Sequence, residues 1–244
     1  MGRIMLTWTS GRITALVSMA VLACVLSACG SGEPESSGAS ASTPSSVNSG
    51  EDAAESSQEG CLLEKGCAIG GIGPGGGLVF LISGRRTYEM APNTWSGDGG
   101  QDPYLVWCNN SNSDIVGATG TAVGTGAANT KLIAAACKSG AANAALAYAG
   151  GGKTDWFLPS KDELNAMCNY SHNPTSPAAP TVACSGAQDE TFENGTFGFI
   201  TGGPSYWSST QLDDEFASDQ SIYDGLQGGY TKDSNPLVRP VRVY

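Results

Sequence analysis

The sequence predicts an α+β domain at residues 61–244, behind an N-terminal targeting segment and a linker. Two segments carry apolar residues at helical spacing, at residues 129–149 and 160–170. Around and after them lie several short apolar runs separated by Gly, Asn and Asp, a pattern typical of short strands. Two helices among many short strands indicate an α+β fold rather than alternating β and α units.

Residues 1–28 have the order of a secretory signal peptide. Arg3 and Arg12 precede an uncharged apolar run at residues 13–28. The run is shorter than the roughly 20 residues that a membrane-spanning helix needs, and no basic stop-transfer cluster follows it. We therefore expect a cleaved signal peptide rather than a transmembrane anchor.

The end of this segment resembles a bacterial lipobox. It reads Leu26-Ser27-Ala28-Cys29, followed by small residues. The resemblance implies cleavage before Cys29 and attachment of a diacylglyceryl group with palmitate-type chains. Two or three such chains would hold the protein stably at a membrane. An ordinary signal peptide with a chance cysteine is the alternative.

The stretch after the lipobox, residues 29–60, is rich in Ser, Gly, Ala, Glu and Pro. It contains six acidic residues and no Lys or Arg. Such a segment cannot bury enough apolar surface to offset the entropy of ordering it. We expect a disordered tether that holds the domain away from the membrane, on the extracytoplasmic side of the cell envelope.

Six cysteines remain once Cys24 and Cys29 are set aside. An even number in an exported chain favours disulfides. A zinc site is the rival, but the chain has no C-x-x-C motif and one histidine. Sequence proximity suggests three bridges, although other pairings stay open: Cys61–Cys67, Cys108–Cys137 and Cys168–Cys184.

The charge balance excludes some partners. Twelve Lys and Arg stand against 23 Asp and Glu, a formal net charge of −11. Nucleic acids are bound chiefly through clustered basic residues, so a nucleic-acid partner is not expected. Polyanionic ligands are disfavoured for the same reason.

A glycine-rich stretch at residues 70–77 leads into an apolar strand at residues 78–82. The glycine spacing invites comparison with a nucleotide-binding loop. Such loops follow a strand and open a helix, whereas this one precedes a strand. We therefore interpret it as a structural turn.

The remaining elements have conventional boundaries. Asn129 or Thr130 can cap the first helix, and three glycines after residue 149 end it. Ser160 and Glu163 form a capping box for the second helix. Pro240 predicts an edge position or a bulge for the last strand. The expected strands lie at residues 156–158, 197–200, 206–209, 216–222 and 238–243.

Five sequence blocks, taken together, resemble the ordered signature of the Lcl C-terminal-domain family. They cover about residues 66–244 and comprise residues 73–80, 121–130, 155–165, 206–210 and 238–242. The resemblance implies a C-type-lectin-like fold, related to the formylglycine-generating-enzyme group. It also implies use as an extracellular adhesion or ligand-binding module on bacterial surfaces.

The same blocks carry large apolar and charged side chains. Trp156, Phe157 and Trp207 are expected to anchor loop-rich structure to a small core. Ion pairs could tie the second helix to the terminal strand through Asp155, Lys161, Asp162, Arg239 and Arg242.

Few residues suggest catalysis or metal binding. His172 is the only histidine, no G-x-S-x-G motif is present, and nothing marks an activated thiol, so we expect no enzyme activity. A calcium ion could be held by the densest acidic cluster, although a solvated acidic loop is the alternative: Asp213, Asp214, Glu215, Asp219 and Asp224. No other cofactor is expected.

Two loop regions, residues 98–112 and 211–230, are the expected contact surface. Their aromatics could stack on sugar rings or protein side chains: Tyr104, Trp107, Tyr223 and Tyr230. That these rings fill the core under long loops is the alternative. The sequence thus predicts a surface-anchored, adhesin-like lipoprotein that recognises a glycan or a protein. A structural cell-envelope protein without a small-ligand site is the second hypothesis.

Overall fold

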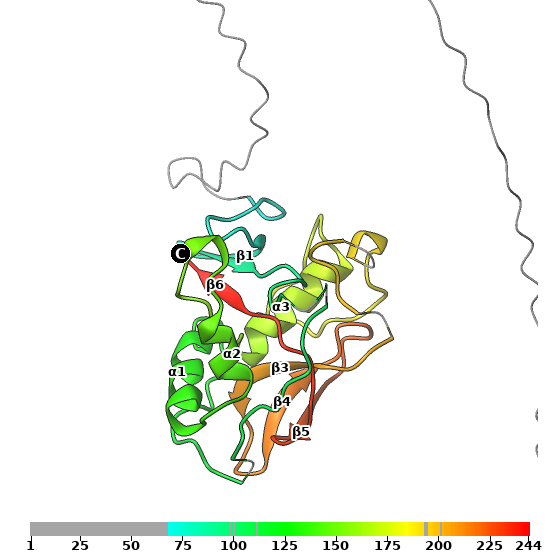
Figure 1. Ribbon diagram of the computed structural model, residues 1–244. Helices are drawn as coiled ribbons and strands as arrows, with labels where there is room; N and C mark the ends of the chain where they lie inside the picture. The colour runs from blue at the N-terminus through cyan, green and yellow to red at the C-terminus, as the bar shows by residue number, and fades with distance from the viewer. Residues whose placement is uncertain (1–67, 98, 100, 111, 193–194, 201) are drawn as a thin grey trace, which may run out of the picture. The chain divides into compact units, whose positions relative to one another are not determined.

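The computed structural model describes residues 68–97, 99, 101–110, 112–192, 195–200 and 202–244 (Figure 1). They belong to one compact unit, Ala53–Tyr244. The predicted signal peptide, lipidated Cys29, the tether, the domain start at residue 61 and the pair Cys61–Cys67 all lie outside the described residues. Among the described helices, none has the length and apolar character needed to span a bilayer.

The described part is a mixed fold of three α-helices and two small antiparallel sheets. One sheet has the order β1-β2-β6, formed by Leu78–Ser83, Arg86–Met90 and Val241–Val243. The other has the order β3-β4-β5, formed by Tyr206–Gln211, Phe216–Gln220 and Gln227–Thr231. The expected combination of helices with short antiparallel strands is confirmed.

The strand predictions were partly wrong. Residues 197–200 form no strand, and residues 156–158 contribute one isolated bridge, between Phe157 and Val241. The sequence analysis missed β2, which carries the charged Glu89, and β5, which contains two glycines. Pro240 immediately precedes β6, an edge strand of its sheet, as expected.

The first predicted helix is two helices, α1 (Gly126–Ala136) and α2 (Ala141–Ala147). The break occurs at Gly140, whose φ is 139°. A Cβ on Gly140 would lie 2.5 Å from the carbonyl oxygen of Trp107, and the N–H of Ala141 donates to the carbonyl of Val106 at 2.9 Å. The chain at residues 106–107 therefore sits against the break, where only glycine fits.

The third helix, α3 (Lys161–His172), begins as predicted. The Ser160 hydroxyl accepts from the N–H of Glu163, and the Glu163 carboxylate accepts from the N–H of Ser160 at 2.8 Å. The same carboxylate also accepts from the N–H of Gly124 at 2.7 Å, which fixes the loop before α1. α3 contacts strands of both sheets (Figure 1).

The interior contains two hydrophobic cores, which are separated by three extended segments around residues 157–158, 206–207 and 237–238. In three neighbouring extended segments, successive residues belong to opposite cores, as the two-residue period of extended chain requires. Phe157, Tyr206 and Leu237 join the core around α3, β1 and β2. Leu158, Trp207 and Val238 join the core around α1 and α2. The expected anchors Trp156, Phe157 and Trp207 are all buried.

The glycine-rich loop closes around a carboxylate of the chain itself. The N–H groups of Gly75 and Gly77 donate to Glu89 at 3.0 and 2.9 Å, and Arg242 Nη1 donates to the same carboxylate at 2.8 Å. Glu89 is fully buried. The loop amides that could have held a phosphate are thus occupied, which supports the structural interpretation.

The predicted ion-pair network is partly confirmed. Arg242 pairs with Asp155, as expected, and also with Glu89. Arg239 pairs with Asp102, a residue that the sequence analysis did not consider. Lys161 and Asp162 join none of the ion pairs found among the described residues, so the expected link between the helix and the last strand is wrong.

Two of the three predicted disulfides are confirmed. Cys108 is bonded to Cys137, and Cys168 is bonded to Cys184. The first joins the segment before α1 to the end of α1, and the second joins α3 to the loop that follows it. Each bridge therefore pins a long loop to a helix.

Candidate functional site

A groove on the domain is lined by aromatic and small side chains from two parts of the chain. Its volume is about 400 Å³, within the roughly 300–1,000 Å³ typical of small-molecule sites. One wall comes from the segment between β2 and α1, and the other from α2 and the residues after it. We call it the aromatic groove, lined by Trp95, Ser96, Pro103, Leu105, Ala144, Ala147, Tyr148 and Ala149.

The rings of Trp95 and Tyr148, which line the aromatic groove, are held in place by contacts with the protein interior. Trp95 Nε1 donates to Asp102 Oδ1 at 3.0 Å and to the carbonyl of Val238 at 2.9 Å. Tyr148 packs between Trp95 and the buried Trp156, with ring centroids 5.7 and 4.9 Å apart. A ligand would therefore lose little affinity to the ordering of these side chains.

Asp102, which holds Trp95, is itself part of a buried network. Its carboxylate accepts from Arg239 Nε at 2.6 Å, from Arg239 Nη2 at 2.5 Å and from the Tyr206 hydroxyl at 2.8 Å. Burial raises the pKa of Asp102, and the adjacent guanidinium opposes that shift. This network fixes Trp95 from the interior.

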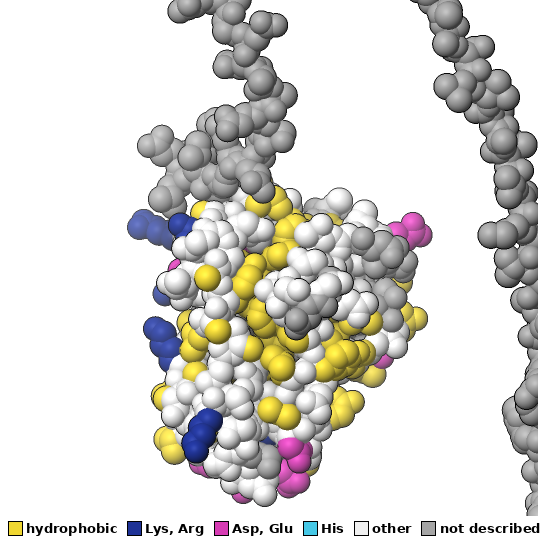
Figure 2. Space-filling model, viewed as in Figure 1, with side chains coloured by type: hydrophobic (Ala, Val, Ile, Leu, Met, Phe, Trp, Pro, Cys, Tyr) yellow, Lys and Arg dark blue, Asp and Glu magenta, His cyan; other side chains and the backbone are white. Residues whose placement is uncertain are grey.

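The lining of the aromatic groove contains no Asp, Glu, Lys, Arg or His. Figure 2 shows hydrophobic side chains gathered along the middle of the visible face, with Lys, Arg and acidic side chains toward its edges. The Ser96 hydroxyl oxygen is buried and has no hydrogen-bond partner among the described residues. The groove thus has an uncharged, mainly apolar lining that includes two hydroxyl-bearing residues, Ser96 and Tyr148.

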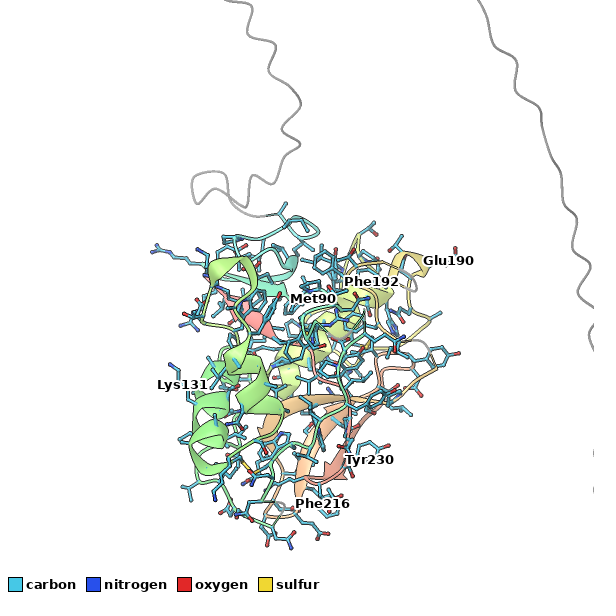
Figure 3. All side chains as sticks on the ribbon, in the orientation of Figure 1. Met90, Lys131, Glu190, Phe192, Phe216 and Tyr230 are labelled. Atoms are coloured by element: carbon cyan, nitrogen blue, oxygen red, sulfur yellow. A yellow bond between two sulfur atoms is a disulfide. The ribbon has the colours of Figure 1, made fainter. Side chains whose placement is uncertain are left out.

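Three of the four predicted contact aromatics are exposed. Tyr104, Tyr223 and Tyr230 expose 52%, 53% and 49% of their surface. Tyr104 comes from the chain segment that supplies Pro103 and Leu105 to the groove. Tyr230, labelled in Figure 3, packs edge-on against Trp207, whose Nε1 donates to the carbonyl of Leu105 at 2.8 Å. Tyr104 and Tyr230 are thus both connected to the groove wall.

The prediction that Trp107 contacts a ligand is wrong. Its side chain is fully buried, and its Nε1 donates to the carbonyl of Ser208 at 2.7 Å. The disulfide of the next residue, Cys108, draws this segment into the core around α1 and α2. For Trp107 the alternative of a ring that fills the core is correct.

The sequence analysis missed Trp95 and placed Tyr148 in the predicted helical segment at residues 129–149. Trp95 follows a Pro-Asn-Thr turn and precedes a Gly-rich loop. A large aromatic residue in such a loop is the sequence feature that could have indicated a binding site. Tyr148 fits the helical stripe by spacing, but α2 ends at Ala147. Its ring therefore lies at the helix end, where it lines the groove.

The proposed acidic cluster does not converge on one point. Asp213 Oδ1 accepts from the N–H groups of Glu215 and Phe216, and Asp224 Oδ1 accepts from the N–H of Leu226. Asp219 is buried in β4. Among the described residues, no group of three carboxylates has its oxygens close enough to share a metal ion.

A lysine ammonium group occupies the inside of this acidic turn. Lys232 is buried, and its Nζ donates to the carbonyls of Ser113, Asp213 and Asp214, each at 2.8 Å, and to Gln211 Oε1 at 2.9 Å. Burial lowers the pKa of Lys232, while the nearby carboxylates oppose the shift. The ammonium group of Lys232 therefore holds the acidic turn in place.

Replacing Lys232 with Met should destabilise the domain without creating a calcium requirement. The change leaves several buried oxygens without a donor, so we expect the free energy of unfolding to fall by about 1–3 kcal/mol. Urea unfolding measures the loss, and Lys131→Met, at an exposed position of α1, serves as the control. For the unmodified chain, a melting temperature that rises by several degrees with calcium would contradict this interpretation of the turn.

Asp219 is a buried carboxyl group with one unsatisfied oxygen. Oδ1 has no hydrogen-bond partner among the described residues, and burial raises the pKa of the group, opposed by a hydrogen bond from Ser205. When folding raises the pKa of a carboxyl group, the free energy of unfolding of the protein falls as the pH rises through that pKa. Asp219 therefore weakens the fold at neutral and alkaline pH.

Asp219→Asn should accordingly stabilise the protein at pH 8, by about 1–3 kcal/mol if the unsatisfied charged oxygen is the main cost. The gain should shrink as the pH falls from 8 toward 4, because the raised pKa of Asp219 favours the neutral carboxyl group in the folded protein. Urea unfolding at both pH values tests this, with the exposed Asp214→Asn as control. An equal gain at both pH values would show that charge is not the cause.

His172 lies at the end of α3 between two loops. Nδ1 is 3.1 Å from the carbonyl of Ser185, and Nε2 is 2.6 Å from the carbonyl of Ile222 and 3.8 Å from Cys168 Sγ. Cys168, His172 and Cys184 bring three metal-capable side chains together, but the two sulfurs are bonded to each other. With both nitrogens against backbone carbonyls, the ring serves as a clip between loops.

No protein-family model matches the chain, and no curated protein matches it.

Proposed function

We propose that this chain is a lipid-anchored bacterial envelope protein whose C-terminal domain recognises an extracellular glycan or protein without catalysis. The aromatic groove carries the proposal. Its preordered rings, uncharged lining and volume of about 400 Å³ are properties of a binding site. The resemblance to the Lcl C-terminal-domain family and its C-type-lectin-like fold belongs to the same proposal.

Anchoring and export rest on independent features. The lipobox-like Leu26-Ser27-Ala28-Cys29 and the acidic stretch after it favour a tethered protein. The two disulfides of the described domain support an oxidising, extracytoplasmic environment. A domain displayed in this way can meet ligands outside the cell.

The non-catalytic part of the proposal follows from how the reactive groups are used. Both nitrogens of His172 face carbonyls, Cys108, Cys137, Cys168 and Cys184 are in disulfides, and Glu89, Glu163 and Asp102 are engaged by backbone amides or Arg side chains. These groups act as structural partners of the fold. Recognition then depends on the shape and chemistry of the groove and loops.

A binding screen of the full chain tests the proposal. Arrays of glycans and matrix proteins, probed with and without calcium, should show at least one ligand whose binding does not depend on calcium. Cys29→Ala should shift the protein from the membrane fraction to the soluble or unprocessed pool. An absence of any bound ligand would argue against recognition, and membrane retention without incorporated fatty acid would argue against lipidation.

A further inference from the structure

We propose that the aromatic groove takes an uncharged pyranose ring of a glycan. The inference rests on the proposed function and specifies its ligand. A pyranose presents a face of C–H groups and a rim of hydroxyls, so it needs an apolar, partly aromatic surface with a few polar contacts. The aromatic groove supplies that combination.

The charge of the lining selects against ionic ligands. No side chain that lines the groove carries a charge, and Asp102, which accepts from Trp95, is already engaged inside the protein. Asp102 is neutralised by Arg239 at 2.5 Å, and its remaining hydrogen bonds go to Trp95 and Tyr206. A carboxylate or sulfate entering the groove would lose its hydration without gaining a partner there.

Two hydroxyl-bearing side chains, Tyr148 and Ser96, line the groove. The Ser96 oxygen is covered by protein atoms and lacks a hydrogen-bond partner among the described residues. A ring hydroxyl can both donate to and accept from a side-chain hydroxyl group such as that of Tyr148. Trp95 Nε1 is already committed to Asp102 and Val238, so Trp95 contributes its apolar surface rather than its N–H.

The small residues of α2 create the space. Ala144 and Ala147 lie one helical turn apart and both line the groove, and Ala147 is exposed. A larger side chain at residue 147 would project into the groove from the surface of a helix, where leucine is well tolerated by the backbone. This position therefore allows the groove to be filled without disturbing the core.

The test titrates the full chain with maltotriose, cellotriose and triacetylchitotriose, and with trigalacturonate and a heparin tetrasaccharide as charged counterparts. At least one uncharged trisaccharide should bind with a Kd below about 1 mM. Ala147→Leu should weaken that binding at least tenfold. Ala135→Leu, the same change at an exposed alanine of α1 outside the groove, should leave it unchanged. Thermal melting confirms that both variants fold.

Two ring variants sharpen the assignment. Trp95→Ala should weaken binding at least tenfold, whereas Trp95→Phe, which keeps a ring, should retain it within about threefold. Binding of only the charged saccharides, or of a proline-rich peptide in a manner lost on Ala147→Leu, would overturn the sugar assignment.

The proposed function and this inference can fail separately. If an uncharged sugar binds but Ala147→Leu has no effect, while Tyr223→Ala abolishes binding, the groove assignment is wrong and the recognition function stands. If the full chain binds nothing on the arrays or in these titrations, both are wrong.

Discussion

Arg239→Met is expected to lower the free energy of unfolding at neutral pH by about 3–5 kcal/mol, because it leaves the buried Asp102 carboxylate without its counter-charge. Arg239 is 1% exposed and Asp102 is 3% exposed. Burial alone would lower the pKa of Arg239, but the paired carboxylate raises it above the ordinary value. The guanidinium is therefore charged in the fold and needed there.

The loss should depend on pH in a defined direction. Without Arg239, the pKa of Asp102, already raised by burial, should rise further. A carboxyl group with a raised pKa costs stability above that pKa and not below it, so the deficit of the variant should shrink from pH 8 to pH 5. Urea unfolding at both values measures it. Arg85→Met, at an exposed turn position, should change stability by less than about 0.5 kcal/mol.

A deficit that stays constant across this pH range would mean that Arg239 acts through packing and not through its charge. The guanidinium also lies 4.6 Å from the centroid of the Phe199 ring and donates to the carbonyl of Gly198 at 2.7 Å. Both contacts are lost in Met as well, but neither loss varies with the ionisation of Asp102. The pH dependence therefore isolates the ion pair.

Removal of the Cys108–Cys137 bridge should have the second large effect on stability. The two cysteines are 29 residues apart, and closing a loop of that length contributes on the order of 3–4 kcal/mol in the chain-entropy model. The double variant Cys108→Ala/Cys137→Ala should lose about that much. Both cysteines are buried beside Trp107, so part of the loss will come from packing.

The second bridge provides a matched comparison. Cys168 and Cys184 are 16 residues apart, and the same model assigns their bridge about 3 kcal/mol. We expect Cys168→Ala/Cys184→Ala to be destabilised slightly less than the first double variant. A loss below about 1 kcal/mol for the first, or free thiols at Cys108 and Cys137 by alkylation, would contradict the assigned role.

Some local signals in the sequence were reliable, but the predicted cap at Asn129 or Thr130 was wrong, because α1 begins at Gly126 and both residues lie inside it. The Ser160–Glu163 capping box predicted the start of α3 because both of its hydrogen bonds join residues three positions apart. The two confirmed disulfides likewise connect cysteines that are neighbours in the sequence. Pro240 marked the edge strand because a missing N–H has the same consequence in any fold.

Features that depend on distant contacts were missed. The break between α1 and α2 exists because the carbonyl of Trp107 lies against Gly140, and the burial of Trp107 depends on an acceptor at Ser208. The buried Lys232 could not be distinguished from a surface lysine, since its acceptors come from residues 113 and 211–214. The aromatic groove is lined by two segments about 50 positions apart in the sequence, so no local sequence pattern could predict it.

The indole N–H signals of the full chain in a ¹⁵N–¹H spectrum test the assigned site most directly. The sequence contains five tryptophans, and the signal missing from Trp95→Phe identifies Trp95. On addition of the uncharged trisaccharide that binds best, we expect the Trp95 signal to move while that of the buried Trp107 stays in place. An unmoved Trp95 signal at saturating trisaccharide would contradict a sugar-binding role for the aromatic groove.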